Sequence, residues 1–262
     1  MAGSTLQRAA DVCLVVVGWQ QHVDYPLIVA GNRDEFHKRP TESANWWPDQ
    51  PDVLGGRDLQ AGGTWLALHK RGRFATVTNY RDAEPPSAKN RSRGHLVTEF
   101  LGSALSPEQY LQTIDGSKYA GFNLLVSDGD SLAWLSNRGD GVKVLPAGIY
   151  GLSNALLDSP WHKVRRAKSR LSDLIHSDNV NETQLLRLLN DREKAPVSQI
   201  ESDRLPFDTA HAISAPFIVL PDYGTRSSSV ALLERSNRWR LQERRFDAGG
   251  NKVGESVFRF DA

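Results

Sequence analysis

The order of strand-like and helix-like segments constrains the fold of this chain more than any other feature. Short apolar runs bounded by turn residues form two blocks, and a pair of helical patterns follows each block. Strands grouped in blocks indicate layered α+β architecture rather than repeated βαβ units. The sequence contains no glycine-rich motif of the Rossmann or P-loop type. Nucleotide-binding folds of those two classes therefore have no support.

The first block contains four strand-like runs: residues 13–19, 25–31, 64–70 and 73–79. The first two are joined by a polar turn and predict a hairpin that ends in the polar residues 32–35. Between the two pairs, residues 39–63 are rich in proline, tryptophan and glycine, and we expect a loop without regular structure there. Helical spacing then extends from Ser92 to Ile114. A second helix is expected to begin at Ser106, because serine caps helices well and proline follows it.

The second block repeats this plan with strand-like runs at residues 122–128, 131–137, 142–146 and 149–154. Helices are expected at 161–177 and 183–191, and closing strands near 217–220, 228–234, 238–246 and 256–260. The basic segment 162–170 is interpreted as a solvated helix face, with binding to an anionic lipid or membrane surface as the alternative.

Composition limits the classes of protein to which the chain can belong. The net charge is +1, which gives no electrostatic reason to expect a nucleic-acid partner. No apolar stretch is long enough to span a membrane, and residues 1–12 are too polar for a signal peptide. The seven histidines are scattered, so no metal site is expected. We expect a soluble, cytoplasmic protein with one domain at residues 13–262, preceded by an N-terminal extension at 1–12.

Cys13 is the only cysteine, and it stands at the head of the first apolar run. A lone cysteine cannot form an internal disulfide, and buried core packing is the usual role of a free thiol. The alternative is nucleophilic catalysis. If the chain began at Cys13, its own α-amino group, with a pKa of about 8, could accept the thiol proton without a histidine.

Two routes would make Cys13 the first residue. One is self-cleavage after Val12, and the other is translation from a GTG codon at position 12 followed by removal of the initiator methionine. We favour the second route, because residues 1–12 are polar, rich in alanine and without apolar periodicity.

The polar cluster at residues 31–40 also allows two interpretations. One is a solvated turn with ion pairs. The other places Arg33 and Asp34 beside Cys13, where a guanidinium would lower the thiol pKa and a carboxylate would orient the free amine. Successive strand residues face opposite ways, so Arg33 and Asp34 can both point at Cys13 only if the strand breaks there.

These segments carry a resemblance to a known family. Cys13 followed by 26-PLIVAGNRDEFHKRP-40, 55-GGRDLQAGGTWLAL-68, 150-YGLSNALLDSPWHKV-164 and 222-DYGTRSSSVALL-233 resembles the NRDE family, also called transport and Golgi organisation protein 2. That family is similar to the cysteine branch of the N-terminal-nucleophile hydrolases, which implies a four-layer αββα sandwich. This implied fold agrees with the strand and helix blocks. Family members typically begin Met-Cys, so the residues before Cys13 are a departure.

Carried over position by position, the resemblance implies six catalytic residues: Cys13, Arg33, Asp34, Asn79, Asn154 and Arg226. Cys13 matches the nucleophile, and Arg33 and Arg226 match an early and a late arginine. Asp34 matches the carboxylate, with Glu35 as the alternative, because this branch usually separates arginine and carboxylate by two residues.

Asn79 resembles the oxyanion-hole asparagine and Asn154 the asparagine near the substrate carbonyl. Independently of the resemblance, asparagine amides can stabilise an oxyanion by about 3 kcal/mol each. The alternative is that both asparagines cap turns after strands. We further assign Asn32, Glu35 and Trp65 to substrate binding, with core packing as the alternative for Trp65.

Two functions follow from these residues and the resemblance. The first is a hydrolase that cleaves a non-peptide C–N amide bond of a small, partly apolar substrate, without a cofactor. The second is a non-catalytic protein on the same scaffold that binds and transports heme, lipid or acyl-CoA, because a fold does not fix a function.

Overall fold

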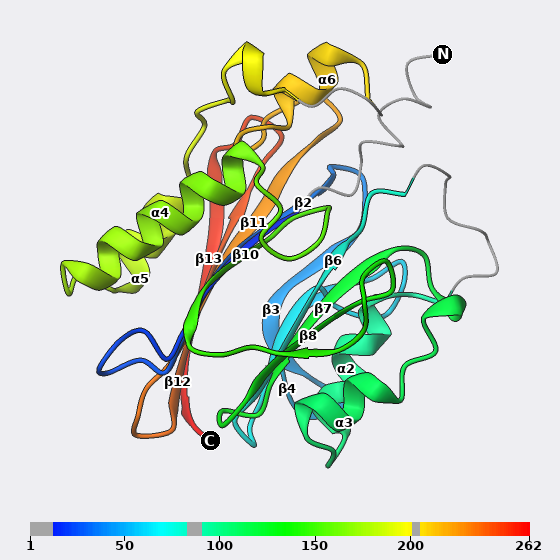
Figure 1. The fold of residues 1–262 in the computed structure, drawn as a ribbon, viewed down its shortest axis with the longest axis vertical. Helices are drawn as coiled ribbons and strands as arrows, with labels where there is room; N and C mark the ends of the chain where they lie inside the picture. The colour runs from blue at the N-terminus through cyan, green and yellow to red at the C-terminus, as the bar shows by residue number, and fades with distance from the viewer. Residues whose placement is uncertain (1–12, 83–90, 201–204) are drawn as a thin grey trace.

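The structure of this chain is a computed structural model that describes residues 13–82, 91–200 and 205–262. The expected N-terminal extension at residues 1–12 lies outside the described residues. Figure 1 shows the described part as two facing sheets with helices on their outer sides.

The first sheet contains Cys13 in its second strand. Its order is β10-β1-β2-β11-β12-β13, and all neighbours in it are antiparallel. The bounds are β1 (Cys13–Trp19), β2 (Leu27–Phe36), β10 (Gly148–Leu152), β11 (Tyr223–Leu233), β12 (Arg238–Phe246) and β13 (Lys252–Asp261). The hairpin of β1 and β2 confirms the prediction from the first two apolar runs, although residues 32–35 continue the strand instead of ending it.

The second sheet is formed by seven consecutive strands in sequence order, all antiparallel. They are β3 (Thr41–Trp47), β4 (Gln50–Asp58), β5 (Leu66–His69), β6 (Arg73–Asn79), β7 (Phe122–Ser127), β8 (Leu132–Ser136) and β9 (Lys143–Val144). Our expectation of a loop at residues 39–63 is wrong, because β3 and β4 lie there. Their pairing shifts register twice, so the alternation of apolar residues that marks a strand is interrupted.

Helices cover the outer face of each sheet, as Figure 1 shows. The bounds are α2 (Gly94–Gly102), α3 (Pro107–Gln112), α4 (His162–His176), α5 (Glu182–Leu189) and α6 (Phe207–Ala212), with 3-10 turns η1 (Gly116–Lys118) and η2 (Val197–Gln199). Ser106 caps α3 as predicted, with a reciprocal bond to Gln109. The sequence did not predict α6, and no strand forms at 217–220, where only Val219 makes an isolated bridge.

Three apolar cores separate the four layers. One lies between the sheets and includes Val15, Val29 and Trp239. The second joins α2 and α3 to the second sheet, and the third joins α4 and α5 to the first sheet. The expected four-layer αββα sandwich is therefore confirmed.

Within the described residues, no helix is long and apolar enough to cross a membrane. The same part of the chain contains no group of three or more histidine, cysteine, aspartate or glutamate side chains that could hold a metal ion.

Candidate active site

Cys13 is the first residue of β1 and lies opposite Arg33 of β2. Its carbonyl oxygen accepts a hydrogen bond of 2.7 Å from the Ser153 hydroxyl, just after β10. Burial raises the pKa of the thiol to about 12, and the nearby Asp34 carboxylate adds to this shift. A hydrogen bond from the Asp34 backbone and the charge of Arg33 oppose it. In the chain as it stands, the thiol is therefore protonated and weakly nucleophilic at neutral pH.

Arg33 and Asp34 lie on opposite faces of the first sheet, because β2 does not break between them. Arg33 faces the second sheet, where its Nη1 donates to Thr41 Oγ1 at 3.1 Å. Its guanidinium lies 4.5 Å from the centre of the Trp65 ring. Asp34 faces the helical layer, so only Arg33 shares a face with Cys13, its cross-strand partner.

Asp34 is buried, and only one of its two carboxylate oxygens accepts a hydrogen bond among the described residues. Its Oδ1 accepts from Thr225 Oγ1 at 2.6 Å, whereas Oδ2 is buried with no hydrogen-bond partner among the described residues. Burial raises the pKa of this carboxyl to about 7, against the opposing charges of Lys163 and Arg33. The unused oxygen can accept a hydrogen bond from one more cationic or hydrogen-donating group.

Glu35, the alternative carboxylate, belongs to a different network. Its Oε2 lies 3.5 Å from Arg33 Nη2 and 3.4 Å from Arg39 Nε. Asp58 of β4 joins the same network, 2.7 Å from Arg39 Nε. Glu35 is thus held by arginines between the sheets, and Asp34 is the carboxylate with an unused oxygen near Cys13.

The two asparagines lie together. The Asn154 side chain is buried, and its Nδ2 donates to the Asn79 carbonyl oxygen at 3.0 Å. Asn154 is bonded through its Oδ1 to Ser153, the residue that holds the Cys13 carbonyl. The Asn79 side chain makes no hydrogen bond within the described residues, so its amide can donate to a ligand. Hydrogen bonds therefore connect the start of β1 and the end of β6 to the residues just after β10.

Arg226 occupies a bulge of β11, between the register positions of Thr225 and Ser227. Its Nη1 donates to the carbonyl oxygens of Phe36 at 2.8 Å and Arg39 at 3.3 Å. Burial and the charge of Arg33 lower its pKa. Arg226 holds the turn after β2, so direct contact with a reacting group stays a prediction.

The remaining assigned residues have structural partners. Asn32 is buried, donates to the carbonyl oxygens of Leu189 and Pro216, and accepts from Ser228. Trp65 packs against the core between the sheets beneath Arg33. Roles in substrate binding for Asn32, Glu35 and Trp65 stay predictions.

Lys163 is a site residue that the sequence analysis missed. It lies at the start of α4, is 3% exposed, and its charge acts on both Asp34 and Cys13. Burial lowers its pKa to about 8. The expectation of a solvated basic helix face is wrong at this position. Lys163 stands four and eight residues before the buried Ala167 and Leu171, and that spacing could have revealed it.

Comparison with known proteins identifies the family. The model of the family "Transport and Golgi organisation 2" matches residues 12–248. The homologue from Bos taurus is 37% identical over 240 residues, which cover 84% of this chain and 86% of the relative. The Homo sapiens homologue is 34% identical over 239 residues, with the same coverage. The chain belongs to the Transport and Golgi organisation 2 family.

The fold of this family member also resembles that of a solved structure. A mutant of the conjugated bile acid hydrolase from Clostridium perfringens superposes with a TM-score of 0.50 at 9% identity. The match covers 96% of this chain and 97% of that chain. At this identity the likeness shows a shared fold, the N-terminal-nucleophile sandwich. The resemblance to the NRDE family and its expected fold are both confirmed.

Proposed function

We propose that this protein is a cysteine N-terminal-nucleophile hydrolase that cleaves a non-peptide C–N amide bond of a small, partly apolar substrate. Cys13 becomes the nucleophile once it is the first residue of the chain. Asp34 carries the proposal: one of its oxygens is buried without a partner among the described residues, and its charge acts on the Cys13 thiol. The α-amino group of a chain that begins at residue 13 could donate an N–H hydrogen bond to this oxygen and keep its lone pair for the thiol proton.

The raised pKa of the Cys13 thiol supports the same proposal, because the thiol needs a base to become a nucleophile. With a pKa of about 12, only about one thiol in 10⁵ is ionised at pH 7. A new α-amino group would donate a hydrogen bond to Asp34 and, in its neutral form, supply a base beside the sulfur. The longer chain is therefore latent, and removal of the preceding residues activates it.

The proposed reaction uses the α-amino group twice. Cys13 Sγ attacks the amide carbon while its proton passes to the amine, and the oxyanion accepts a hydrogen bond from Asn79. Asn154 fixes the Asn79 backbone. The protonated amine then gives its proton to the leaving nitrogen, and the C–N bond breaks. Water attacks the resulting thioester, which releases the carboxylic acid and restores the thiol.

The experiment compares two forms of the protein, one that begins at Cys13 and one that keeps residues 1–12. Each is assayed against a panel of fluorogenic N-acyl amides whose acyl chains differ in length. We expect hydrolysis by the form that begins at Cys13, and at least a 100-fold lower rate in the longer form. Cys13→Ala in the shorter form should abolish turnover. Equal rates in the two forms, or turnover by Cys13→Ala, would contradict the proposal.

A second candidate function is binding and transport of heme, lipid or acyl-CoA without catalysis. The raised thiol pKa favours it, because a protonated Cys13 in the longer chain is an inert neighbour for a ligand. Titration with heme, followed by Soret absorbance, tests the proposal that heme is the ligand. A saturable spectral change at micromolar protein would support transport, and an unchanged spectrum would exclude heme.

A further inference from the structure

A cavity of about 480 Å³ lies beside the candidate active site. Tyr80 and Arg81 after β6, Asn154 after β10 and the first residues of α4 form part of its wall. Asn154 connects this wall to the nucleophile, because it is bonded to Ser153, which holds the Cys13 carbonyl. A ligand in the cavity therefore lies next to the groups assigned to the reaction.

Cationic side chains gather at the cavity wall. Lys163, Arg81 and Arg165 line it, and none of the described lining residues is acidic. Lys163 Nζ is buried without a hydrogen-bond partner in the described part of the chain, and the same holds for Nε2 of His162, another lining residue. An ammonium buried in this way costs several kcal/mol unless an anion accepts its hydrogen bonds.

Asp34 does not supply that anion. Its charge acts on Lys163, yet the two groups do not form an ion pair, and Asp34 Oδ2 is itself unpartnered among the described residues. Arg81 meanwhile lowers the pKa of Lys163, which indicates two cations close to each other at the cavity wall. Like charges placed together around a cavity indicate a site for a negative ligand.

The beginning of α4 adds hydrogen-bond donors at the same place. The residue that precedes the helix is Trp161, whose side chain makes no capping bond. The first N–H groups of a helix have no partner within the helix, and together with the helix dipole they favour an anion. Lys163 and His162 belong to this first turn and line the cavity, so their side chains and the backbone N–H groups can bind the same anion.

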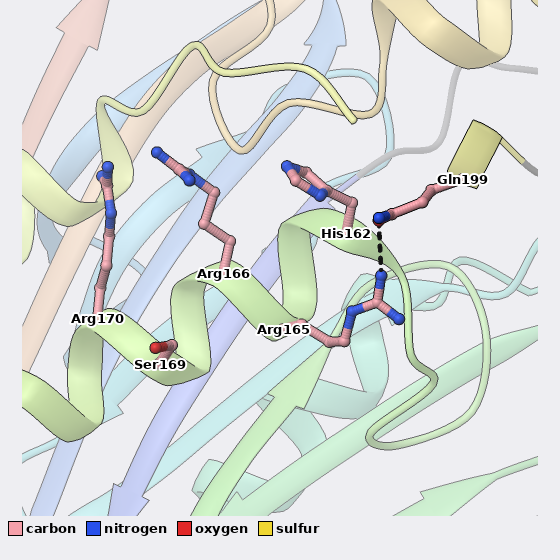
Figure 2. Close-up of a pocket in the computed structure, with 6 residues that line it drawn as sticks. All are labelled: His162, Arg165, Arg166, Ser169, Arg170 and Gln199. Carbon is pink, nitrogen blue, oxygen red and sulfur yellow. Dashed lines mark hydrogen bonds between the residues drawn. The ribbon is translucent and has the colours of Figure 1, made fainter. Parts of the chain in front are cut away.

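A neighbouring basic hollow differs from this cavity because its two central arginines are paired with carboxylates. It follows α4 and has a volume of about 630 Å³. Arg166 and Arg170 lie side by side there (Figure 2), but both form ion pairs with Asp191, and Arg166 also pairs with Glu193. These two guanidinium groups are therefore paired with carboxylates within the protein. Lys163 Nζ has no such partner among the described residues.

Other lining residues of the cavity are apolar. They include Trp161, Ala195, Ile200 and Ile213. Pockets that combine an apolar wall with a few placed polar groups are typical of small-molecule sites, and their volumes start at about 300 Å³. The cavity suits a molecule with an apolar body and one anionic end.

We propose that this cavity binds organic anions through Lys163 and the first turn of α4, and that the substrates are amides that also carry a free carboxylate. The statement about substrates rests on the proposed hydrolase function, whereas anion binding does not. The apolar part of the ligand contacts the wall formed around Ile200 and Ile213.

The test measures binding without turnover, in the full chain that carries Cys13→Ala. Isothermal titration compares octanoate with octanamide, which has the same size and no charge. We expect octanoate to bind at least 10-fold more tightly. Adding Lys163→Met should reduce this preference to about 1, because methionine keeps the length of the side chain and removes its charge.

Lys168→Met is the matched control, since Lys168 lies on the same helix, pairs with Asp158 and does not line the cavity. It should keep the preference for octanoate. Equal affinity for the two probes in the Cys13→Ala chain, or no binding of octanoate, would overturn the inference, and that comparison does not depend on how Lys163→Met folds. If the octanoate preference holds but the form that begins at Cys13 hydrolyses none of the N-acyl amides, only the proposed function is overturned.

Discussion

Asp34 is an ionisable residue that the fold buries without satisfying both of its oxygens. The pKa of its carboxyl is about 7 in the folded chain, above the usual value of about 3.8. Between these values the folded chain holds a proton that the unfolded chain has lost. The contribution of Asp34 to stability is therefore fully present below about pH 4 and is lost as the pH rises through 7.

Asp34→Asn should therefore stabilise the longer chain at pH 8, by on the order of 2 kcal/mol, because it removes a buried charge and keeps an acceptor for Thr225. The difference from the unmodified chain should shrink as the pH falls and vanish below about pH 4. Urea unfolding across this pH range measures it. Asp130→Asn, on the surface, is the control; the same pH-dependent gain there would contradict the account.

Cys13 gives a second prediction at this scale. Because burial raises the pKa of its thiol to about 12, the longer chain should react with iodoacetamide at pH 7.5 at least 100-fold more slowly than the chain that begins at Cys13. Intact mass measured over time follows the reaction. Both forms should react equally fast in denaturant, and equal rates in the folded state would show that the amine does not activate the thiol.

At the scale of elements, strands with a regular pattern of apolar residues were predictable from the sequence, and strands whose pattern is interrupted were not. The runs that became β1, β2 and β12 keep an unbroken apolar pattern or a clear turn. In β4, Gly55 and Gly56 interrupt the pattern because neighbouring groups leave no room for a side chain. A Cβ on Gly55 would lie 2.6 Å from the Leu66 carbonyl oxygen. The glycines that suggested a loop are thus required by the sheet.

Gly56 also supports the site. A Cβ there would lie 2.2 Å from the Trp65 ring, which packs against the Arg33 guanidinium. Gly56→Ala should destabilise the fold by about 1–3 kcal/mol and reduce hydrolysis, because the displaced ring moves Arg33. Gly102→Ala is the control, since nothing lies within 4 Å of its Cβ position. Thermal unfolding and the rate of hydrolysis test both variants; an unchanged Gly56→Ala protein would refute this role of Trp65.

For the whole molecule, the site depends on contacts that a sequence cannot specify. Six site residues were predicted by their order in family motifs, and the structure brings Cys13, Asp34, Asn79 and Asn154 to one end of the two sheets. The sequence allowed Arg33 and Asp34 both to point at Cys13 only if the strand broke between them, and β2 does not break there. Which carboxylate keeps an unused oxygen is decided by distant partners such as Thr225, which sequence spacing cannot specify.

The chain that begins at Cys13 should fold like the longer chain. β1 pairs with β2 along its whole length from Cys13, and with β10 from Val15, so the described contacts of the strand do not need the residues before it. Melting temperatures of the two forms should agree within a few degrees. A large loss of stability in the shorter form would show that residues 1–12 contribute to the fold.

The central claim is that Cys13 forms a thioester with the acyl group of an amide once its own amine is released. The most direct measurement is the intact mass of the chain that begins at Cys13, acid-quenched during turnover of an N-acyl amide. The account predicts a mass increase equal to the acyl group, located at Cys13 and absent from both Cys13→Ala and the longer chain. Substrate cleavage with no acyl adduct on Cys13 would contradict it.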